Sequence, residues 1–283
     1  MAKRGVTPGL KLLLVLLLAT GAFISLLPLL YMLSHSLKSF AETITRVSAI
    51  PFDPKFWPRV PQWDNYKVAW SEASFGLYFR NSVIISAVTV TGIVVTSSLA
   101  AYAFAKLRFA GRDLIFSILL ATLMIPQTVL LIPNFIIIAK LGWVDRLPAL
   151  TVPFLANAFH IFLLRQFFMQ IPNELLEVAK IDGCSHLRAL WSIVLPLSRA
   201  PLFTVVFLSY IYTWNALQWP LVVTQTPRWR PIAVGLTVFI NEAGPETHLR
   251  LAGAMIAVLP VICVYFVAQR QFTEAISRSG LKG

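Results

Sequence analysis

The stretch that decides the fold runs from Asn81 to Ala105 and reads NSVIISAVTVTGIVVTSSLAAYAFA. It contains no Asp, Glu, Lys or Arg. A helix rises about 1.5 Å per residue, so a helix of this length crosses the roughly 30 Å of hydrocarbon in a bilayer. The stretch therefore predicts a membrane-spanning helix.

Five more runs of the sequence lack charged side chains over a comparable length. They cover residues 12–36, 114–139, 147–164, 200–223 and 251–269. The chain is 57% hydrophobic, compared with roughly 45–50% in soluble domains. We therefore expect an all-α integral membrane protein, in which residues 1–283 form a single transmembrane domain with six transmembrane helices.

Basic residues indicate how the chain is oriented. Lys3, Arg4 and Lys11 precede the first run, as in a signal peptide, but the run exceeds the roughly 7–15 apolar residues of such a peptide, which favours a retained anchor. The short connector 106–113 carries three basic residues and therefore belongs on the cytoplasmic side. This predicts an inner-membrane protein with both termini and loop 166–199 in the cytoplasm.

On the extracytoplasmic side, segment 37–80 is predicted to be an extended loop anchored by tryptophans. Segment 224–250 is predicted to be either a contact for another protein or a solvated loop.

Within the spans, Pro126 and Pro133 should kink the third helix. The ladder Gly92, Thr96 and Ala100 would let another helix approach closely, either from a second subunit or from the same chain.

Several function classes lack the residues they need. No G-x-x-x-x-G-K-[ST] motif occurs, so the chain has no P-loop for nucleotide phosphates. Its Lys and Arg are scattered between apolar runs, which does not favour nucleic-acid binding. The four His, with Cys184 and Cys263, match no metal-ligand spacing. We expect no catalytic residue, no metal site and no enzymatic activity.

A polar stretch, IPNELLEVAKIDGCSHLRALWSIVLP at residues 171–196, interrupts the apolar sequence. Asn173 is placed to cap a first short helix, Gly183 to make the turn, and Ser185 to cap a second helix that Pro196 would end. The stretch predicts a helix-turn-helix at the membrane surface. A solvated amphipathic loop is the alternative.

This stretch also carries a family resemblance. The pattern Glu177-Val-Ala-x-x-Asp-Gly183, followed by I-x-L-P at 193–196, resembles the EAA loop of binding-protein-dependent ABC importers. Further segments are similar to maltose-type carbohydrate permeases, more narrowly to the six-helix partner of a heterodimeric pair. They are WDNY at 63–66, AYAFA at 101–105, FLLRQFF at 162–168, WNALQWPL at 214–221 and GLKG at 280–283.

The resemblance implies a function and a set of partners. The chain would be the permease subunit of an importer that moves a sugar by alternating access, together with a second permease, two ATPase subunits and an extracytoplasmic sugar-binding protein. The chain itself would hold no cofactor, since the ATPase binds ATP and Mg²⁺. The alternatives are the same machine for glycerol phosphate or a polyol, a stand-alone secondary transporter, and a membrane-anchored enzyme.

The resemblance also implies how the loop docks onto the ATPase. Glu177 would pair with a basic residue, Ala179 would allow close seating, Asp182 would brace the turn, and Gly183 would set it, with Ser185 following. Val178 and Cys184 depart from the usual smaller residues of the family.

Polar residues within the predicted spans are candidates for the substrate pathway, because a neutral sugar needs amide, hydroxyl and aromatic partners. The candidates are Asn157, Tyr212, Trp214, Asn215 and Gln218. Packing inside the helix bundle, or a place for the tryptophan in the interfacial aromatic belt, is the alternative for these side chains.

Overall fold

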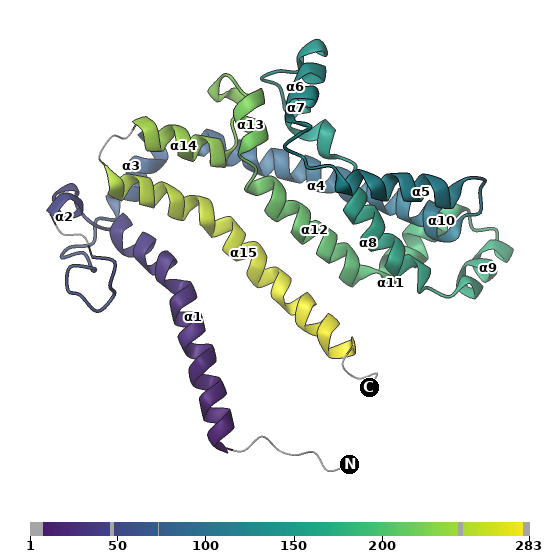
Figure 1. Cartoon of the computed structure of the whole chain (residues 1–283), viewed down its shortest axis with the longest axis horizontal. Helices are drawn as coiled ribbons and strands as arrows, with labels where there is room; N and C mark the ends of the chain where they lie inside the picture. The colour runs from purple at the N-terminus through teal and green to yellow at the C-terminus, as the bar shows by residue number, and fades with distance from the viewer. Residues whose placement is uncertain (1–7, 46–47, 73, 243–245, 280–283) are drawn as a thin grey trace. The chain divides into compact units, whose positions relative to one another are not determined.

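The computed structural model describes residues 8–45, 48–72, 74–242 and 246–279; their regular secondary structure is helical, with no strand (Figure 1). The all-α prediction is confirmed for these residues. The chain divides into two compact units, which are described separately. One comprises Met1–Phe75 and Leu236–Val258, and the other Gly76–Gly235 and Leu259–Gly283.

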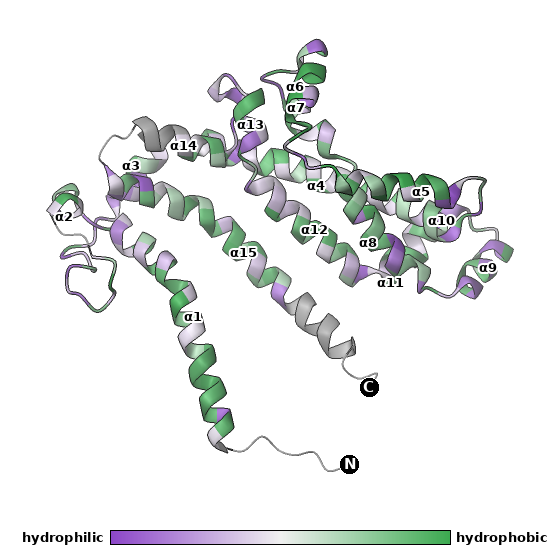
Figure 2. Ribbon diagram, viewed as in Figure 1, coloured by the Kyte–Doolittle hydropathy of each residue, from purple (hydrophilic) through white to green (hydrophobic). Residues whose placement is uncertain are grey.

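The first unit contains the N-terminal helix and two short helices. They are α1 (Pro8–Ser36), α2 (Phe40–Thr45) and α3 (Asp64–Glu72). The first predicted span lies within α1, whose ribbon is largely hydrophobic (Figure 2). The apolar side chains between Leu10 and Leu18 are exposed. An apolar surface of this extent is stable in lipid or against another subunit, but not in water.

A buried lysine anchors the segment that follows α1. Lys38 is fully buried, and its Nζ lies 3.0 Å from Nε2 of His35 and donates to the Lys55 carbonyl at 2.7 Å. Asn65 donates from Nδ2 to the carbonyls of Ser36 and Lys38. Burial lowers the pKa of the Lys38 ammonium. Segment 37–80, predicted to be an extended loop, therefore contains two short helices and is held in place by buried hydrogen bonds.

The second unit contains α4 and the nine helices that follow it. They are α4 (Phe75–Lys106), α5 (Arg112–Ala121), α6 (Leu131–Lys140), α7 (Leu147–Thr151), α8 (Ala158–Met169), α9 (Asn173–Ile181), α10 (His186–Ala189), α11 (Leu195–Leu197), α12 (Arg199–Trp214) and α13 (Gln218–Val223). Two further helices contribute residues to both units, α14 (Ile232–Glu242) and α15 (Thr247–Ser279).

Three of the predicted spans are broken. The third ends its first helical part at the 3₁₀ turn Thr122–Met124 and resumes only at Leu131, because Pro126 has no N–H to donate. Pro133 lies in the first turn of α6, where proline is tolerated. The fourth span bends by 41° between Leu147–Phe154 and Ala158–Met169. The fifth unwinds between α12 and α13.

The described helices do not by themselves confirm the predicted count of six spans. Three described helices are long and apolar enough to cross a membrane, namely Gly9–Ser36, Phe75–Lys106 and Thr247–Gln269. Counting each of two bent helix pairs as one span raises the number to five. One of these pairs joins His186–Leu197 to Arg199–Trp214 at 87° and was not predicted. Nor was α14, in the segment expected to be an external loop.

The core of the second unit joins α4 to α8, α12 and the polar loop. Buried Tyr102, Leu164, Phe168, Leu190 and Val205 belong to one apolar cluster. The ladder predicted on α4 packs within the chain: a Cβ on Gly92 would lie 2.3 Å from Cδ2 of Leu155, and Thr96 Oγ1 donates to the Leu155 carbonyl.

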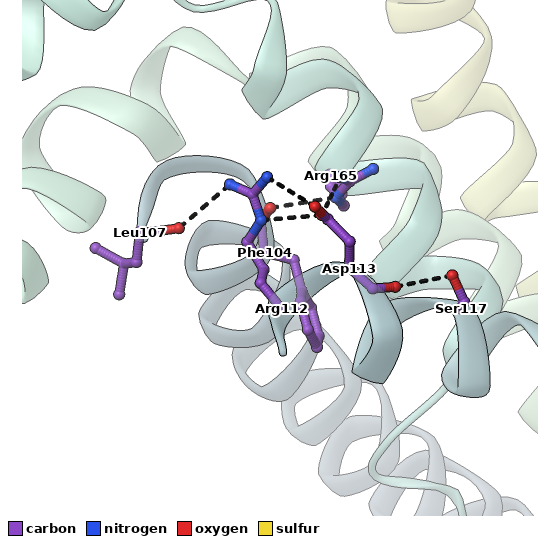
Figure 3. A network of polar contacts seen from close by, with 6 residues as sticks. All are labelled: Phe104, Leu107, Arg112, Asp113, Ser117 and Arg165. Atoms are coloured by element: carbon purple, nitrogen blue, oxygen red, sulfur yellow. Dashed lines mark hydrogen bonds and ion pairs between the residues drawn. The ribbon is translucent and has the colours of Figure 1, made fainter. Parts of the chain in front are cut away.

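An arginine network ties three segments together beside this core (Figure 3). Arg165 on α8 donates from Nε to the Phe104 carbonyl at 3.2 Å and lies over the Phe116 ring at 4.1 Å. Its Nη2 is 3.9 Å from Oδ1 of Asp113, which also accepts from Nε of Arg112. The hydrogen bond from Arg112 lowers the pKa of the Asp113 carboxyl.

We expect Arg165→Lys to lower the free energy of unfolding by about 1–3 kcal/mol, because a lysine ammonium reproduces neither the Nε hydrogen bond nor the planar stacking on the ring. Arg112→Lys is the matched control, since it removes a guanidinium from the same carboxylate. Asp113 is exposed and Arg112 only half-buried, so loss of their pair should cost at most about 1 kcal/mol. Thermal unfolding of the two purified variants measures the difference, and equal losses would contradict the role given to Arg165.

Candidate functional site: a surface loop and a polar cavity

The polar loop contains two helical segments joined by a turn. Gly183 has φ +77°, and its N–H donates to the Lys180 carbonyl at 3.1 Å. The Ser185 hydroxyl caps α10 by accepting from the Arg188 N–H at 3.4 Å. The second helical segment continues through a π-helical turn, Leu190–Val194, to the end of α11.

Two details of the predicted loop are wrong. Asn173 does not cap α9; its Oδ1 accepts instead from Nζ of Lys106 at 2.9 Å. Pro196 lies inside α11, which ends one residue later. Lys106 also donates to the Ile171 carbonyl at 2.5 Å, so the last residue of α4 holds the start of the loop.

The residues predicted to dock lie on the outside of the loop. Glu177, Asp182, Gly183 and Ser185 are exposed, and Ala179 is half-buried. The side chains of Glu177 and Asp182 make no hydrogen bond or ion pair within the part of the chain that the structure describes. The arrangement leaves the turn and its acidic side chains available to another protein.

An exposed apolar face accompanies these residues, and the sequence reasoning missed it. Val178 is 58% and Ile181 85% exposed, with Leu175 beside them, whereas Leu176 packs against the core cluster. The spacing i, i+3, i+6 from Leu175 to Ile181 was the available signal. Apolar side chains this exposed are stable against another protein or against lipid, but not in water.

The second candidate site is a cavity of about 860 Å³ in the second unit. Its lining includes residues from all three helix breaks: Gln127 and Thr128, then Phe154 and Asn157, then Asn215. Non-helical backbone at membrane depth is tolerated where it is buried in protein or lines a water-filled space. The cavity is therefore the place where the broken spans meet.

The cavity collects four of the five residues predicted for the substrate pathway, namely Asn157, Tyr212, Asn215 and Gln218. Tyr212 donates to Oε1 of Gln127 at 2.6 Å, and Asn157 caps α8 by accepting from the N–H groups of residues 159 and 160. Trp214 is the exception. It is buried against the rings of Phe79 and Tyr210 and does not line the cavity.

The cavity has amide and hydroxyl groups set in a mostly apolar lining, and it carries no Lys, Arg, Asp or Glu among the residues that the structure describes. Its aromatic members include Phe154 and Trp219, whose rings meet edge to face with centroids 6.0 Å apart. Trp219 donates from Nε1 to the Ala149 carbonyl at 2.8 Å, which holds the indole in place.

Residues 92–278 match the family model described as the binding-protein-dependent transport system inner membrane component. The chain belongs to this family. It is a transport permease of the inner membrane, and the resemblance seen in the polar loop is confirmed.

Relatives of this permease match it along most of their length. It is 34% identical over 238 residues to the sn-glycerol-3-phosphate transport system permease protein UgpE of Yersinia enterocolitica serotype O:8 / biotype 1B, covering 82% of this chain and 85% of the relative. It is 32% identical over 284 residues to the arabinooligosaccharides transport system permease protein AraQ of Halalkalibacterium halodurans, covering 99% and 100%.

The fold of the permease is also similar to that of a solved structure. A chain from a bacterial ABC transporter involved in the import of the acidic polysaccharide alginate matches with a TM-score of 0.84 at 24% identity, covering 95% of this chain and 99% of that one. A chain from the same type of transporter, in complex with a periplasmic protein bound to an alginate pentasaccharide, matches with a TM-score of 0.60 at 15% identity. These matches concern the fold.

Proposed function

We propose that this permease imports a neutral sugar by alternating access, as one of two related permeases driven by two copies of a separate ATPase. The observation that carries the proposal is the lining of the cavity, which offers amides, hydroxyls and aromatic rings but no charged side chain among its described residues. Few, well-placed polar groups with aromatic faces suit an uncharged polyhydroxylated ligand. The AraQ relative, matched over 99% of this chain, supports the sugar.

Glycerol phosphate is the second candidate, because UgpE is a relative at 34% identity. A phosphate ester calls for Arg, Lys or a helix N-terminus as a partner. The described lining provides neither basic residue, and the first turn of α8, which lies in the lining, already has its N–H groups capped by Asn157. The cavity chemistry therefore favours the neutral sugar over the anion.

For the membrane arrangement we propose six spans with both termini in the cytoplasm. The three long helices supply three spans, and the broken segments 114–139, 147–164 and 200–223 supply the others. The basic connector 106–113 supports placing the polar loop on the cytoplasmic side.

We further propose that residues 166–199 dock onto the ATPase through Glu177, Ala179, Asp182, Gly183 and Ser185. One exposed ion pair contributes only about 0–1 kcal/mol, so Glu177 sets the register of the contact rather than its strength. The strength comes from burial of the apolar face at Val178 and Ile181. ATP and Mg²⁺ are held by the ATPase, and the core cluster shared with α4 and α8 passes the movement of the loop to the spans.

Uptake by the reconstituted complex tests the substrate. The permease, its partner permease, the ATPase and the binding protein are placed in liposomes and offered radiolabelled arabinotriose, maltose or sn-glycerol 3-phosphate, with and without ATP. We expect ATP-dependent uptake of a neutral sugar. Uptake of sn-glycerol 3-phosphate and of neither sugar would show that the substrate is the anion. Uptake without ATP would contradict the ABC mechanism.

A further inference from the structure

Four polar side chains of the cavity have buried atoms without a protein partner. Thr89 lies on α4, His160 on α8, and Ser209 and Thr213 on α12; all line the cavity and are more than nine-tenths buried. One polar atom of each side chain makes no hydrogen bond within the described part of the chain. These atoms are Oγ1 of Thr89, Nδ1 of His160, Oγ of Ser209 and Oγ1 of Thr213.

Two other threonines of this chain have a partner in the preceding turn, whereas Ser86, Ser97 and Ser98 on α4 are also unpartnered. Thr204, also on α12, donates from Oγ1 to the Ala200 carbonyl at 3.1 Å, and Thr224 donates to the Pro220 carbonyl at 2.7 Å. This bond to the preceding turn is the usual way in which a helix satisfies a hydroxyl. Ser209 and Thr213 do not make it, although they stand one turn apart on one face of α12.

Three of the polar side chains that the sequence analysis selected for the substrate pathway differ from these four, because they already have hydrogen-bond partners. Asn157, Tyr212 and Asn215 are already bonded to the protein, to the start of α8, to Gln127 and to the Ile211 carbonyl respectively. Those residues shape the wall of the cavity. The four unpartnered groups belong to residues that line the cavity, and their hydrogen-bonding capacity is unused, which is costly for a buried polar group.

We propose that Thr89, His160, Ser209 and Thr213 form a subsite that hydrogen-bonds the hydroxyl groups of the sugar as it crosses the permease. This rests on the proposed function and names the residues that act on the substrate. Hydroxyls and a neutral imidazole both donate and accept, which matches the same dual capacity of a sugar hydroxyl. Three helices contribute, so the subsite depends on their mutual placement and changes when they move.

The test is the triple variant Thr89→Val, Ser209→Ala, Thr213→Val, which removes three oxygens and nearly preserves side-chain volume. The matched control is Ser97→Ala with Ser98→Ala, two buried hydroxyls on α4 that are equally unpartnered but do not line the cavity. Both are reconstituted with the partner permease, ATPase and binding protein, and ATP-dependent uptake of the labelled neutral sugar is measured, arabinotriose first and then maltose.

We expect the triple variant to assemble with normal yield and an undiminished melting temperature, because removing an unpartnered buried oxygen relieves a desolvation cost. Its uptake should fall roughly tenfold, since a site built to bond hydroxyls loses function when those bonds are missing. The control should transport like the wild type. If the triple variant fails to assemble, Ser209→Ala alone replaces it, with an expected uptake loss of about threefold.

Two results would overturn the inference, and they differ. If the wild type imports a neutral sugar and the triple variant matches the control, the subsite is wrong but the proposed function stands. If the wild type imports sn-glycerol 3-phosphate and neither neutral sugar, the proposed function fails and the subsite fails with it.

Discussion

A Gly183→Pro permease is expected to fold and reach the membrane but to lose its ATPase. Proline is confined to φ near −65°, whereas Gly183 has φ +77°. The substitution also removes the N–H that donates to the Lys180 carbonyl. The turn between α9 and α10 therefore cannot form, and the exposed faces on either side of it are no longer held together. We expect at least a tenfold loss of ATPase recovered with the purified permease.

Gly142→Pro is the matched control for this variant. Gly142 has φ +66°, donates its N–H to the Ala139 carbonyl at 3.0 Å, and has nothing within 4 Å of a Cβ position, just as at Gly183. It lies at the end of α6, outside the proposed docking loop. The permease is purified in mild detergent and the ATPase that accompanies it is quantified. Equal ATPase losses from the two variants would show that the docking assignment is wrong.

The second large effect is expected from Gly235→Ala. A Cβ at this position in α14 would lie 2.1 Å from Cδ2 and 2.6 Å from Cγ of Tyr78, and these ring atoms cannot rotate away as the tip of a flexible side chain would. Tyr78 is itself buried, so the ring has little room to shift. We expect a loss of about 1–3 kcal/mol or more in stability, seen as an apparent melting temperature lower by about 5 °C.

Gly21→Ala tests whether the effect comes from the contact. Gly21 is also helical, in α1, but nothing lies within 4 Å of its Cβ position, and alanine should leave stability unchanged or slightly improve it. Tyr78→Leu combined with Gly235→Ala should recover part of the loss by giving the new methyl group space. An unaltered melting temperature in Gly235→Ala alone would refute the close packing of α14 on α4.

Hydropathy was sufficient for α1, α4 and α15, because uncharged length is set by the bilayer itself. Hydropathy failed where tertiary packing determines whether the backbone stays helical. A run without charges does not reveal that the chain unwinds after Pro126 or between α12 and α13, since partners distant in sequence satisfy the backbone there. The helix α14 was missed because the charged residues around it, Arg228 and Arg230 before it, Glu242 at its end and Glu246 after it, gave the segment the character of a loop.

The two candidate sites were predictable to different degrees. In the polar loop, Gly183 and Ser185 carry local signals, a positive φ and a helix cap, and both act as expected. In the cavity, sequence reasoning selected conspicuous amides and aromatic rings. It did not select Ser209 or Thr213, because an ordinary helical hydroxyl and an unpartnered one have the same sequence pattern.

The broken helices also bear on how the chain is made. Gln127, in the first break, bonds Tyr212, and the Ala149 carbonyl accepts from Trp219, so these contacts join residues separated by 85 and 70 positions. A ribosome that has just completed α8 has synthesised the first two breaks but not yet α12 and α13, which contact this part of the chain. During that interval the nascent chain must hold incomplete spans in or beside the translocation channel. Chains cut short before α12 would expose these unwound segments, which marks them for membrane proteases.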